Sequence, residues 1–310
     1  MNRWMIAFAT VLSCCSSPPY PTFAGLTFEP SAAAYDPATE RLLVLNDVDS
    51  IVYRYAIRDD RLVLPEGEFH RALRYPDEGL GMKFESLTRM PDGSFLAATA
   101  FDRPDPNFRR VVRFSFRRAG PIEAAPIPVD EEALRARVRA VTSGAWFKIE
   151  GVAVDAAGTS VLFGVRQAGP DYRNPRPLVL LLRCPFSEGR IGAPEAAFLL
   201  STRETLGREE GLSDLQRDPR DGSWLILTSH EAGGRHEGHL FRLPAGAFEG
   251  PGPAPSLGRP LRAFRAKPEG LAILPTGALV VVFDDDKEPK KRFSGYEQSE
   301  GLFEIFEPGR

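Results

Sequence analysis

One short motif recurs along the chain at nearly equal spacing. A glutamate that opens a short stretch of small and apolar residues stands at Glu85, Glu150, Glu210 and Glu269, and a weaker copy starts at Glu29. The intervals between these five glutamates are 56, 65, 60 and 59 residues. A period of this length indicates a repeat architecture in which each repeat is one supersecondary unit.

Each copy of the motif is followed by the pattern of several short strands. A turn with Asp, Gly or Pro comes first, and apolar, β-rich runs separated by further loops follow it. The expected strands are residues 95–99, 161–165, 224–228 and 279–283, then 51–57, 111–116, 178–182, 239–243 and 302–306, and a fourth run such as 260–264 before the next motif. Four short strands per repeat predict the blade of a β-propeller.

The number of motifs predicts an all-β propeller with five four-stranded blades, with six blades as the alternative. Only 41 residues follow Glu269, enough for three strands, while residues 20–28 offer one strand before the first motif. The N-terminal strand is therefore expected to complete the last blade.

The longest interval is explained by one inserted helix at 130–141, which has an Asp cap and places Leu134 and Val138 on one face. A two-sheet sandwich or two β domains would give no reason for a charged residue at equal spacing.

The N-terminus has the pattern of an export signal. A basic residue precedes an apolar run that is too short to span a bilayer. Residues 1–14 are expected to be a lipoprotein-type signal peptide with Cys14 lipidated, and plain secretion with cleavage after Ala24 is the alternative. Residues 15–21 then form a tether and 22–310 a single propeller domain. The protein is expected to be periplasmic or anchored to the outer membrane.

The charge of the chain argues against several classes of partner. Lys and Arg number 39 and Asp and Glu number 42, for a formal net charge of −3. Bulk attraction to nucleic acid or anionic lipid is therefore not expected. We expect a monomer that touches a membrane only through its N-terminal lipid.

Three cysteines cannot form a disulfide framework, and Cys184 is expected to be buried.

The repeat places the motif glutamates at one rim of a central channel, because the innermost strand of each blade lines that channel. In an extended chain, residues two apart point to the same side. A base stands two residues before four of the glutamates, at Lys83, Lys148, Arg208 and Lys267. The ends of the second strands return to the same rim and carry, among others, Asp47, Asp49, Asp102, Arg166, His230, Glu231, Asp284, Asp285 and Asp286. Acids and bases are expected to alternate there, either to neutralise a wet channel or to form a site.

The rim residues suggest a metal-dependent chemistry. Converging oxygen ligands suit Ca²⁺ or another divalent cation, which lowers the pKa of a bound water. The expected metal ligands are Glu85, Glu150, Glu210, Glu269 and Asp284. The expected substrate-binding bases are Lys83, Lys148, Arg166 and Lys267, which suit an anionic group. The expected catalytic residues are His230, which would pass protons, and Glu210.

Three of the four histidines lie within residues 230–239. A zinc site in this loop, built from His230, His236 and His239, is a weaker alternative. The segment is not the zinc-binding helix motif, because two glycines interrupt it. The chain also lacks the Gly-x-Ser-x-Gly elbow, the phosphate-binding Gly-Lys-Ser/Thr loop and the dinucleotide fingerprint. Serine-hydrolase, nucleotide-hydrolysing and nicotinamide chemistry therefore lose support.

Three segments resemble a known group of repeats. KIEGVAVDAAGTSVLFGVR, EEGLSDLQRDPRDGSWLILTS and KPEGLAILPTGALVVVFDDD look like the Glu-Gly-Leu-Ala repeats of esterase-like or phytase-like bacterial propellers, or of a related exported family of unknown function. The phytase type implies six blades and a calcium-rich carboxylate face that hydrolyses phosphomonoesters, and the five repeats counted here depart from it.

Two hypotheses follow. One is an exported, divalent-metal-dependent hydrolase that acts on a phosphoester or ester bond of a small anionic or ester substrate. The other is a non-catalytic envelope module that binds a protein or glycan at the same rim, since a propeller fold does not decide function.

Overall fold

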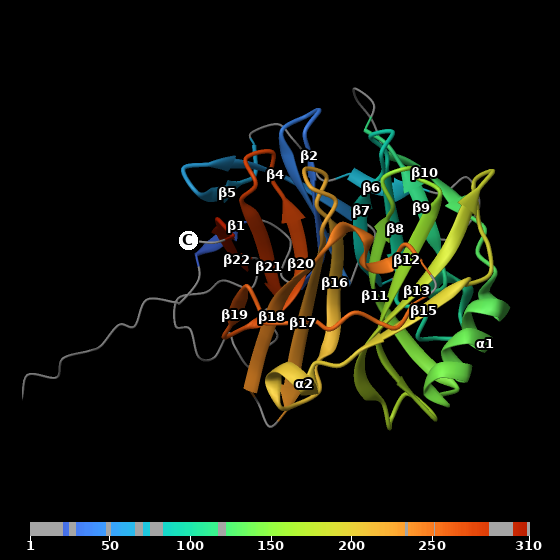
Figure 1. Cartoon of the computed structure of the whole chain (residues 1–310). Coiled ribbons are helices and arrows are strands. Elements are labelled where there is room, and N and C mark those ends of the chain that lie inside the picture. Colours follow the sequence, from blue (N-terminus) through green and yellow to red (C-terminus); the bar gives the residue numbers. More distant parts are fainter. Residues whose placement is uncertain are drawn as a thin grey trace, which may run out of the picture.

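The strands form five blades around a central axis (Figure 1). The computed structural model describes residues 21–24, 29–47, 51–65, 71–74, 83–116, 122–232, 235–250, 252–284 and 300–308. Each blade has four antiparallel strands, so the prediction of five blades, rather than six, is confirmed. The predicted signal peptide, all of the tether except Pro21, and the rim residues Asp49, Asp285 and Asp286 lie outside the described residues.

Each blade follows the same order from the axis outward. The innermost strands of the first to the fifth blade are β2 (Pro30–Asp36), β7 (Phe84–Arg89), β11 (Trp146–Val154), β16 (Gly211–Arg217) and β20 (Lys267–Ile273). The second strands are β3 (Arg41–Asn46), β8 (Phe95–Thr99), β12 (Ser160–Gly169), β17 (Trp224–Ala232) and β21 (Leu279–Asp284). The third strands are β4 (Ile51–Arg58), β9 (Val111–Phe114), β13 (Arg176–Ser187), β18 (Arg235–Leu243) and β22 (Glu300–Phe306). The outermost strands are β6 (Arg71–Arg74), β10 (Ile122–Ile127), β15 (Ala196–Leu200), β19 (Arg262–Phe264) and β1 (Thr22–Ala24).

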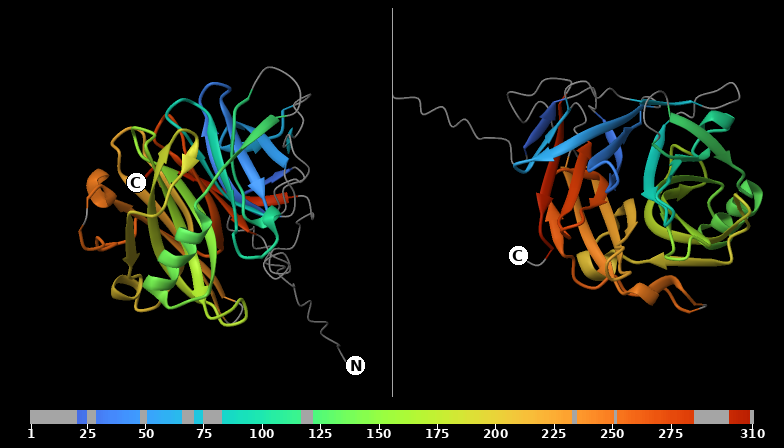
Figure 2. Two further views of the ribbon diagram at one scale, coloured as in Figure 1. Left: turned by 90° about the vertical axis from the view of Figure 1, so that its right-hand side faces the viewer. Right: turned by 90° about the horizontal axis from the view of Figure 1, so that it is seen from above.

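The N-terminal strand closes the ring. β1 pairs antiparallel with β22, with Thr22 opposite Leu302 and Ala24 opposite Glu300. This is the closure that the sequence predicts. The inner strands contact one another in the cycle β2, β7, β11, β16, β20 and back to β2. In the right-hand view of Figure 2 the chain accordingly runs around the axis from blue to red, and the first and last blades are neighbours.

Short additions complete the strand pairing. β5 (Arg61–Val63) pairs with β4, and β14 (Arg190–Ile191) pairs with β13. The outermost strands of the first two blades, β6 and β10, pair in parallel, so these two blades form one continuous sheet. The first and second blades are thus joined by backbone hydrogen bonds as well as by side chains.

The hydrophobic core consists of five layers, one between each pair of neighbouring blades. Successive residues of a strand point to opposite faces, so they enter different layers. In β3, Leu43 and Leu45 pack against the second blade, whereas Leu42 and Val44 pack against the fifth. Because both faces of a blade are covered, its strands are apolar at successive positions instead of alternating.

The inserted helix is present as α1 (Glu131–Thr142). It starts one residue after the predicted position because Asp130 is its N-cap, and the Asp130 carboxylate accepts a hydrogen bond of 3.1 Å from the backbone N–H of Ala133. Leu134 and Val138 are buried in the layer between the second and third blades. The other helices of the described residues are α2 (Arg203–Leu206) and the 3₁₀ turns Pro106–Phe108 and Ala245–Phe248. None of the helices that are described has both the length and the apolar character to cross a membrane.

Replacing Asp130 with Ala is expected to lower the free energy of unfolding by about 1 kcal/mol, because the cap satisfies a backbone donor that has no partner within the helix. Urea denaturation measures the change. Arg137→Ala on the exposed face of α1 is the control, with an expected effect within about 0.5 kcal/mol. An equal loss in both variants would contradict a capping role.

Cys184 is buried, as predicted. Burial raises the pKa of its thiol to about 12. A thiol that stays protonated at neutral pH is a poor nucleophile. Cys184 is therefore a core residue.

Candidate functional site

Acids and bases gather at one mouth of the channel, where the inner strands start and the second strands end. We call this group the charged mouth; it consists of Asp47, Lys83, Glu85, Asp102, Lys148, Glu150, Arg166, Glu231, Lys267, Glu269 and Asp284. Each motif glutamate here has an ion pair with the base two residues before it, as in Lys267 Nζ to Glu269 Oε1 at 2.7 Å. The alternation of charge follows from the extended backbone.

A β-bulge positions the motif glutamates. The strand register skips one residue near the start of every inner strand, and a bulge of this kind re-aims the skipped side chain. The skipped residues are Ser31, Glu85, Glu150, Ser213 and Glu269. Three glutamates and two serines thus occupy equivalent places in the five blades.

This placement corrects the prediction for Glu210 and for Glu29, which stand three and two residues before the bulges of their blades. Glu210 instead faces its own blade and is fully buried. Its carboxylate accepts a hydrogen bond of 2.7 Å from Thr228 Oγ1 and lies 3.0 Å from His239 Nδ1. Despite burial, these bonds and Arg208 lower the pKa of Glu210, so it is a poor proton donor.

The predicted catalytic histidine is not beside Glu210. His230 lies near the end of β17, opposite Glu237 in the strand register, and the histidine that contacts Glu210 is His239 on β18. The alternation of side chains along β18 places His239 toward Glu210. The sequence had offered His239 only as a zinc ligand.

Arg166 is the centre of the charged mouth. Its side chain is 5% exposed and makes hydrogen bonds to Glu150 of the third blade and Glu231 of the fourth. Its Nη1 also lies 3.7 Å from Glu269 Oε1 of the fifth blade and donates to Ser213 Oγ at 3.2 Å. One guanidinium therefore joins three blades.

Other ion pairs extend this network. They are Lys148 with Glu85 (3.0 Å), Lys83 with Asp102 (3.1 Å), Lys267 with Asp284 (2.8 Å) and Lys267 with Glu231 (3.3 Å). All four bases predicted to bind substrate, Lys83, Lys148, Arg166 and Lys267, are thus paired with carboxylates of the protein. This finding supports the reading that the charges neutralise one another around the channel.

The ion pairs shift the pKa of several groups. Burial would raise the pKa of Glu150, but Arg166 and Lys148 outweigh it and lower this pKa to about 2. Burial would likewise lower the pKa of Lys148 and of Arg166, and the neighbouring carboxylates raise both instead. Glu150 is therefore ionised at neutral pH, and the two bases are charged.

Two carboxyl groups of the mouth behave in the opposite way. Burial, together with the negative charge of Glu150, holds the pKa of Glu269 well above its usual value. The positive charge of Lys267 lowers the pKa of Glu269, but by less than burial and Glu150 raise it. Lys267 also lies beside two other carboxylates, Glu231 and Asp284. Burial and the charges of Glu85 and Glu29 raise the pKa of Asp47 to about 7. The buried atoms Glu269 Oε2 and Asp47 Oδ1 have no hydrogen-bond partner among the described residues.

The predicted metal site is not assembled by these side chains. In the part of the chain that the structure describes, no three His, Cys, Asp or Glu side chains lie close enough to hold one metal ion. Glu85, Glu150, Glu269 and Asp284 are each paired with Lys or Arg, and Glu210 is directed away. The described donor set therefore does not fit a divalent cation, nor do His230, His236 and His239 form a zinc site.

Below the charged mouth, the channel is crossed by side chains of the fourth blade. Asp214 Oδ2 accepts a hydrogen bond of 2.7 Å from the backbone N–H of Leu271, and Gln216 Nε2 donates to the carbonyl of Leu87 at 2.8 Å. Burial raises the pKa of Asp214 to about 8, although its backbone donors act in the other direction. Neither residue was singled out from the sequence, because both look like ordinary polar positions of a strand.

Comparisons with known proteins find only distant likenesses. No family model matches the sequence, and no curated protein matches it. Among solved structures, a luciferin-regenerating enzyme is 10% identical over 94% of this chain and 96% of that chain, with a TM-score of 0.45. A calcium-binding regucalcin from Agrobacterium tumefaciens is 16% identical over 93% and 96% of the two chains (TM-score 0.39).

A carbohydrate-active enzyme of family AA12 from Trichoderma reesei, described as a calcium structure, is 12% identical over 93% and 95% (TM-score 0.46). At these identities the likeness is one of fold and says nothing about the chemistry of the charged mouth.

Proposed function

We propose that the charged mouth is the active site of a hydrolase that cleaves an ester or phosphoester bond of a small substrate. The observation that carries this proposal is Glu269, a buried carboxyl group with one oxygen unpaired among the described residues and two cations beside the other. A buried polar atom without a partner requires an explanation, and catalysis is a common one.

Glu269 is suited to act as a general acid. Its raised pKa favours the protonated form, whereas the lowered pKa of Glu150 nearby favours the ionised form. Environments that push the pKa values of neighbouring carboxyl groups apart are characteristic of acid–base sites. In the proposed reaction a water molecule attacks the ester carbon or the phosphorus, and Glu269 donates its proton to the departing oxygen.

Asp47 is the corresponding general base. Its pKa of about 7 leaves about half of the Asp47 carboxyl groups ionised at pH 7 and therefore able to accept a proton. It lies at the same mouth on the first blade, which neighbours the fifth blade that carries Glu269. Asp47 would take the proton of the attacking water, and Lys267 would stabilise the negative charge of the transition state.

Glu269→Gln is expected to reduce kcat/KM at least about 100-fold, the usual contribution of a general acid. Gln has the shape of a protonated Glu but cannot give up a proton in this way, so the fold should persist. The measurement is turnover of nitrophenyl acetate, nitrophenyl butyrate, nitrophenyl phosphate and a simple lactone, with thermal unfolding recorded for both proteins.

The matched control is Glu209→Gln, a carboxylate next to the motif that pairs with the exposed Arg203 at 3.2 Å and accepts a hydrogen bond of 3.2 Å from Thr202 Oγ1, a bond that the Gln amide oxygen can also accept. Its turnover should equal that of the unchanged protein. Equal activity of Glu269→Gln and the unchanged protein would contradict the proposal, as would an unchanged protein that turns over none of the four substrates.

The pH dependence tests the two roles separately. The acid must hold its proton, so kcat/KM falls as pH rises through the raised pKa of Glu269. The base must have lost its proton, so kcat/KM also falls below about pH 7, the pKa of Asp47. Asp47→Asn should lower the rate and remove the limb near pH 7. An unchanged limb in that variant would assign the base to another group.

Calcium at this mouth remains a prediction of the sequence. Because the described carboxylates are already paired with cations, the reaction above contains no step through a metal ion. The same substrate panel with added Ca²⁺ and with a chelator shows whether an ion contributes.

A binding or scaffold role in the cell envelope is the second candidate, favoured by the ion pairs that run between blades. If the charges serve only to hold the ring together and to dock a protein or glycan, no substrate is turned over, and substitutions at the mouth abolish capture of that partner instead.

A further inference from the structure

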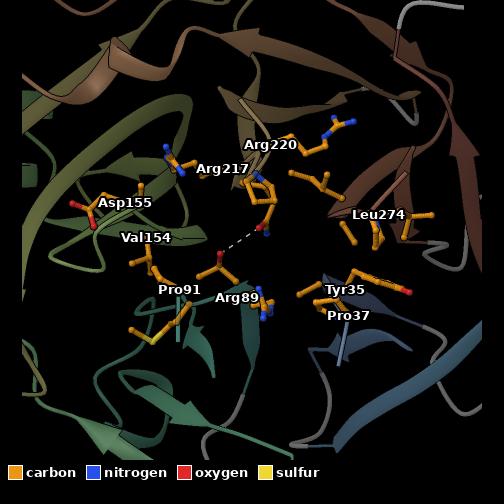
Figure 3. A pocket seen from close by; sticks show the side chains of 18 residues that line it. Tyr35, Pro37, Arg89, Pro91, Val154, Asp155, Arg217, Arg220 and Leu274 are labelled. Atoms are coloured by element: carbon orange, nitrogen blue, oxygen red, sulfur yellow. Dashed lines mark hydrogen bonds between the residues drawn. The ribbon is translucent and has the colours of Figure 1, made fainter. Parts of the chain in front are cut away.

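The opposite mouth of the channel carries a cavity that the activity proposed above does not use. Its volume is about 480 Å³, and it is lined by the ends of all five inner strands (Figure 3). This volume lies within the range of pockets that hold small organic ligands. The hydrogen bond between Thr88 and Gln216, drawn as a dashed line in Figure 3, lies among the side chains that line the cavity.

The chemistry of the lining follows from equivalent positions in the five blades. Counting four residues on from each bulge gives Tyr35, Arg89, Val154, Arg217 and Ile273, and all five line the cavity. Apolar side chains such as Met90, Leu274 and Pro275 lie around them. The cavity thus offers two guanidinium groups, a phenol and an apolar surface.

Arg89 and Arg217 carry positive charge that the described residues do not neutralise. They are the last residues of β7 and β16, and neither has an ion-pair partner within the described ranges. Figure 3 shows Arg89 close to the centre of the view and Arg217 to one side, next to the third blade.

The other charged groups of the lining are already engaged. Arg220 donates two hydrogen bonds to the carboxylate of Asp218, from Nε at 2.9 Å and from Nη2 at 2.6 Å. Asp155 accepts from the backbone N–H and the hydroxyl of Thr159 at 2.7 and 2.8 Å, and it points away from the centre in Figure 3. With Arg220 neutralised by Asp218, the two arginines that are unpaired among the described residues, Arg89 and Arg217, outweigh the one carboxylate of the lining, Asp155, so the cavity has a net positive charge.

We infer that this cavity binds a small organic anion, with a carboxylate, sulfonate or phosphate attracted by the positive charge of Arg89 and Arg217 and held chiefly by Arg89, and with an apolar body against the surrounding strands. Guanidinium groups are well suited to such anions, because their donors match a planar or tetrahedral oxyanion. The apolar lining adds the affinity of burial. The site is separate from the charged mouth, because Asp214 and Gln216 cross the channel between the two.

Anilinonaphthalene sulfonate is a suitable probe, since it joins an anionic group to an apolar body and fluoresces when it leaves water. We expect the unchanged protein to bind it saturably with one site per chain. The double variant Arg89→Gln and Arg217→Gln should weaken binding at least tenfold, with Arg89→Gln alone causing the larger part because Arg89 lies nearer the centre. Phenylnaphthylamine, which has a similar body without the sulfonate, should bind both proteins equally.

The matched control removes two positive charges elsewhere, by Arg190→Gln and Arg203→Gln, both at exposed positions. Its affinity for the sulfonate probe should equal that of the unchanged protein. Thermal unfolding of all variants guards against probe binding to a loosened fold. The inference is overturned if the probe does not saturate at one site, if the Arg89 and Arg217 double variant binds as tightly as the control, or if the neutral probe loses affinity to the same extent.

Discussion

Replacing Arg166 with Met is expected to lower the free energy of unfolding by about 3–5 kcal/mol at neutral pH. The substitution keeps much of the apolar stem but leaves the buried Glu150, which is 1% exposed, with Lys148 as its only remaining cationic partner among the described residues, and it removes the link to Glu231 and Glu269. Breaking a buried ion-pair network by removing one partner is strongly destabilising, because the remaining buried charges are no longer fully compensated. Urea denaturation followed by circular dichroism gives the difference.

The sign of the pH dependence is a second readout of the same variant. The pKa of Glu150 is lowered from 4.5 to about 2 in the folded protein. Its ion pairs therefore stabilise the fold fully above the unfolded pKa, and this contribution is lost as pH falls from about 5 to 2. The difference between the unchanged protein and Arg166→Met should shrink over that range, because the variant has already lost the part of this contribution that Arg166 makes and keeps only the part from Lys148.

Arg203→Met provides the control, because Arg203 is 70% exposed and its ion pair with Glu209 lies at the surface. Exposed pairs contribute between about 0 and 1 kcal/mol. If Arg166→Met were as mild as this control, Arg166 would not join the blades.

The second large effect is expected from Gly270→Ala in the motif of the fifth blade. A Cβ at this position would lie 2.7 Å from the backbone carbon of Ala32 and 2.7 Å from the backbone nitrogen of Ala33. Both atoms belong to β2, the inner strand of the first blade, and backbone cannot rotate away as a side chain can. We expect a loss of about 3 kcal/mol, at the upper end of overpacking effects.

This loss should be accompanied by faster amide exchange in β2 and β20, since the two strands must separate to admit the methyl group. Gly250→Ala is the control, because nothing lies within 4 Å of a Cβ built there. We expect this control to change the free energy of unfolding by less than about 0.5 kcal/mol. Unchanged exchange in β2 and β20 of Gly270→Ala would contradict the close approach.

The architecture could be predicted from the sequence because the apolar runs and turns repeat in every blade. The strand at residues 95–99 and the helix near 130–141 coincide with β8 and α1 to within a residue. The closing strand could be predicted because the last repeat is one strand short. Such patterns can be read within one repeat. Each blade also packs against the next through the same kind of hydrophobic layer, so one repeat predicts the packing of the others.

The site could be predicted only where the motif coincides with the bulge. Glu85, Glu150 and Glu269 are the bulged residues, whereas in the fourth blade Ser213 takes that place and Glu210 lies three residues earlier. Alignment by the glutamate hides this shift. Alignment by the following turn would have shown it, because Ser213 precedes Gly222 by nearly the same distance as Glu85 precedes Gly93.

The ion-pair partners and pKa shifts of the charged side chains depend on contacts between different blades. The pattern of a single repeat does not contain these contacts. Arg166 meets Glu231 and Glu269 because the third, fourth and fifth blades converge on the channel. The same holds for the opposite mouth, where Arg89 and Arg217 come from two blades that are not neighbours in the ring.

The pairing of β1 with β22 has a consequence for the two N-terminal processing sites that the sequence predicts. Cleavage after Ala24 would discard all of Thr22–Ala24, so the mature protein would present the hydrogen-bonding edge of β22 uncovered. Bare edges of this kind recruit other chains and promote aggregation. If the chain were instead processed ahead of Cys14, as the lipoprotein prediction has it, the strand would be retained, and seven residues, 15–21, would separate Cys14 from β1 at the outer edge of the fifth blade. Under that prediction, the fifth blade would be the one nearest the lipid anchor.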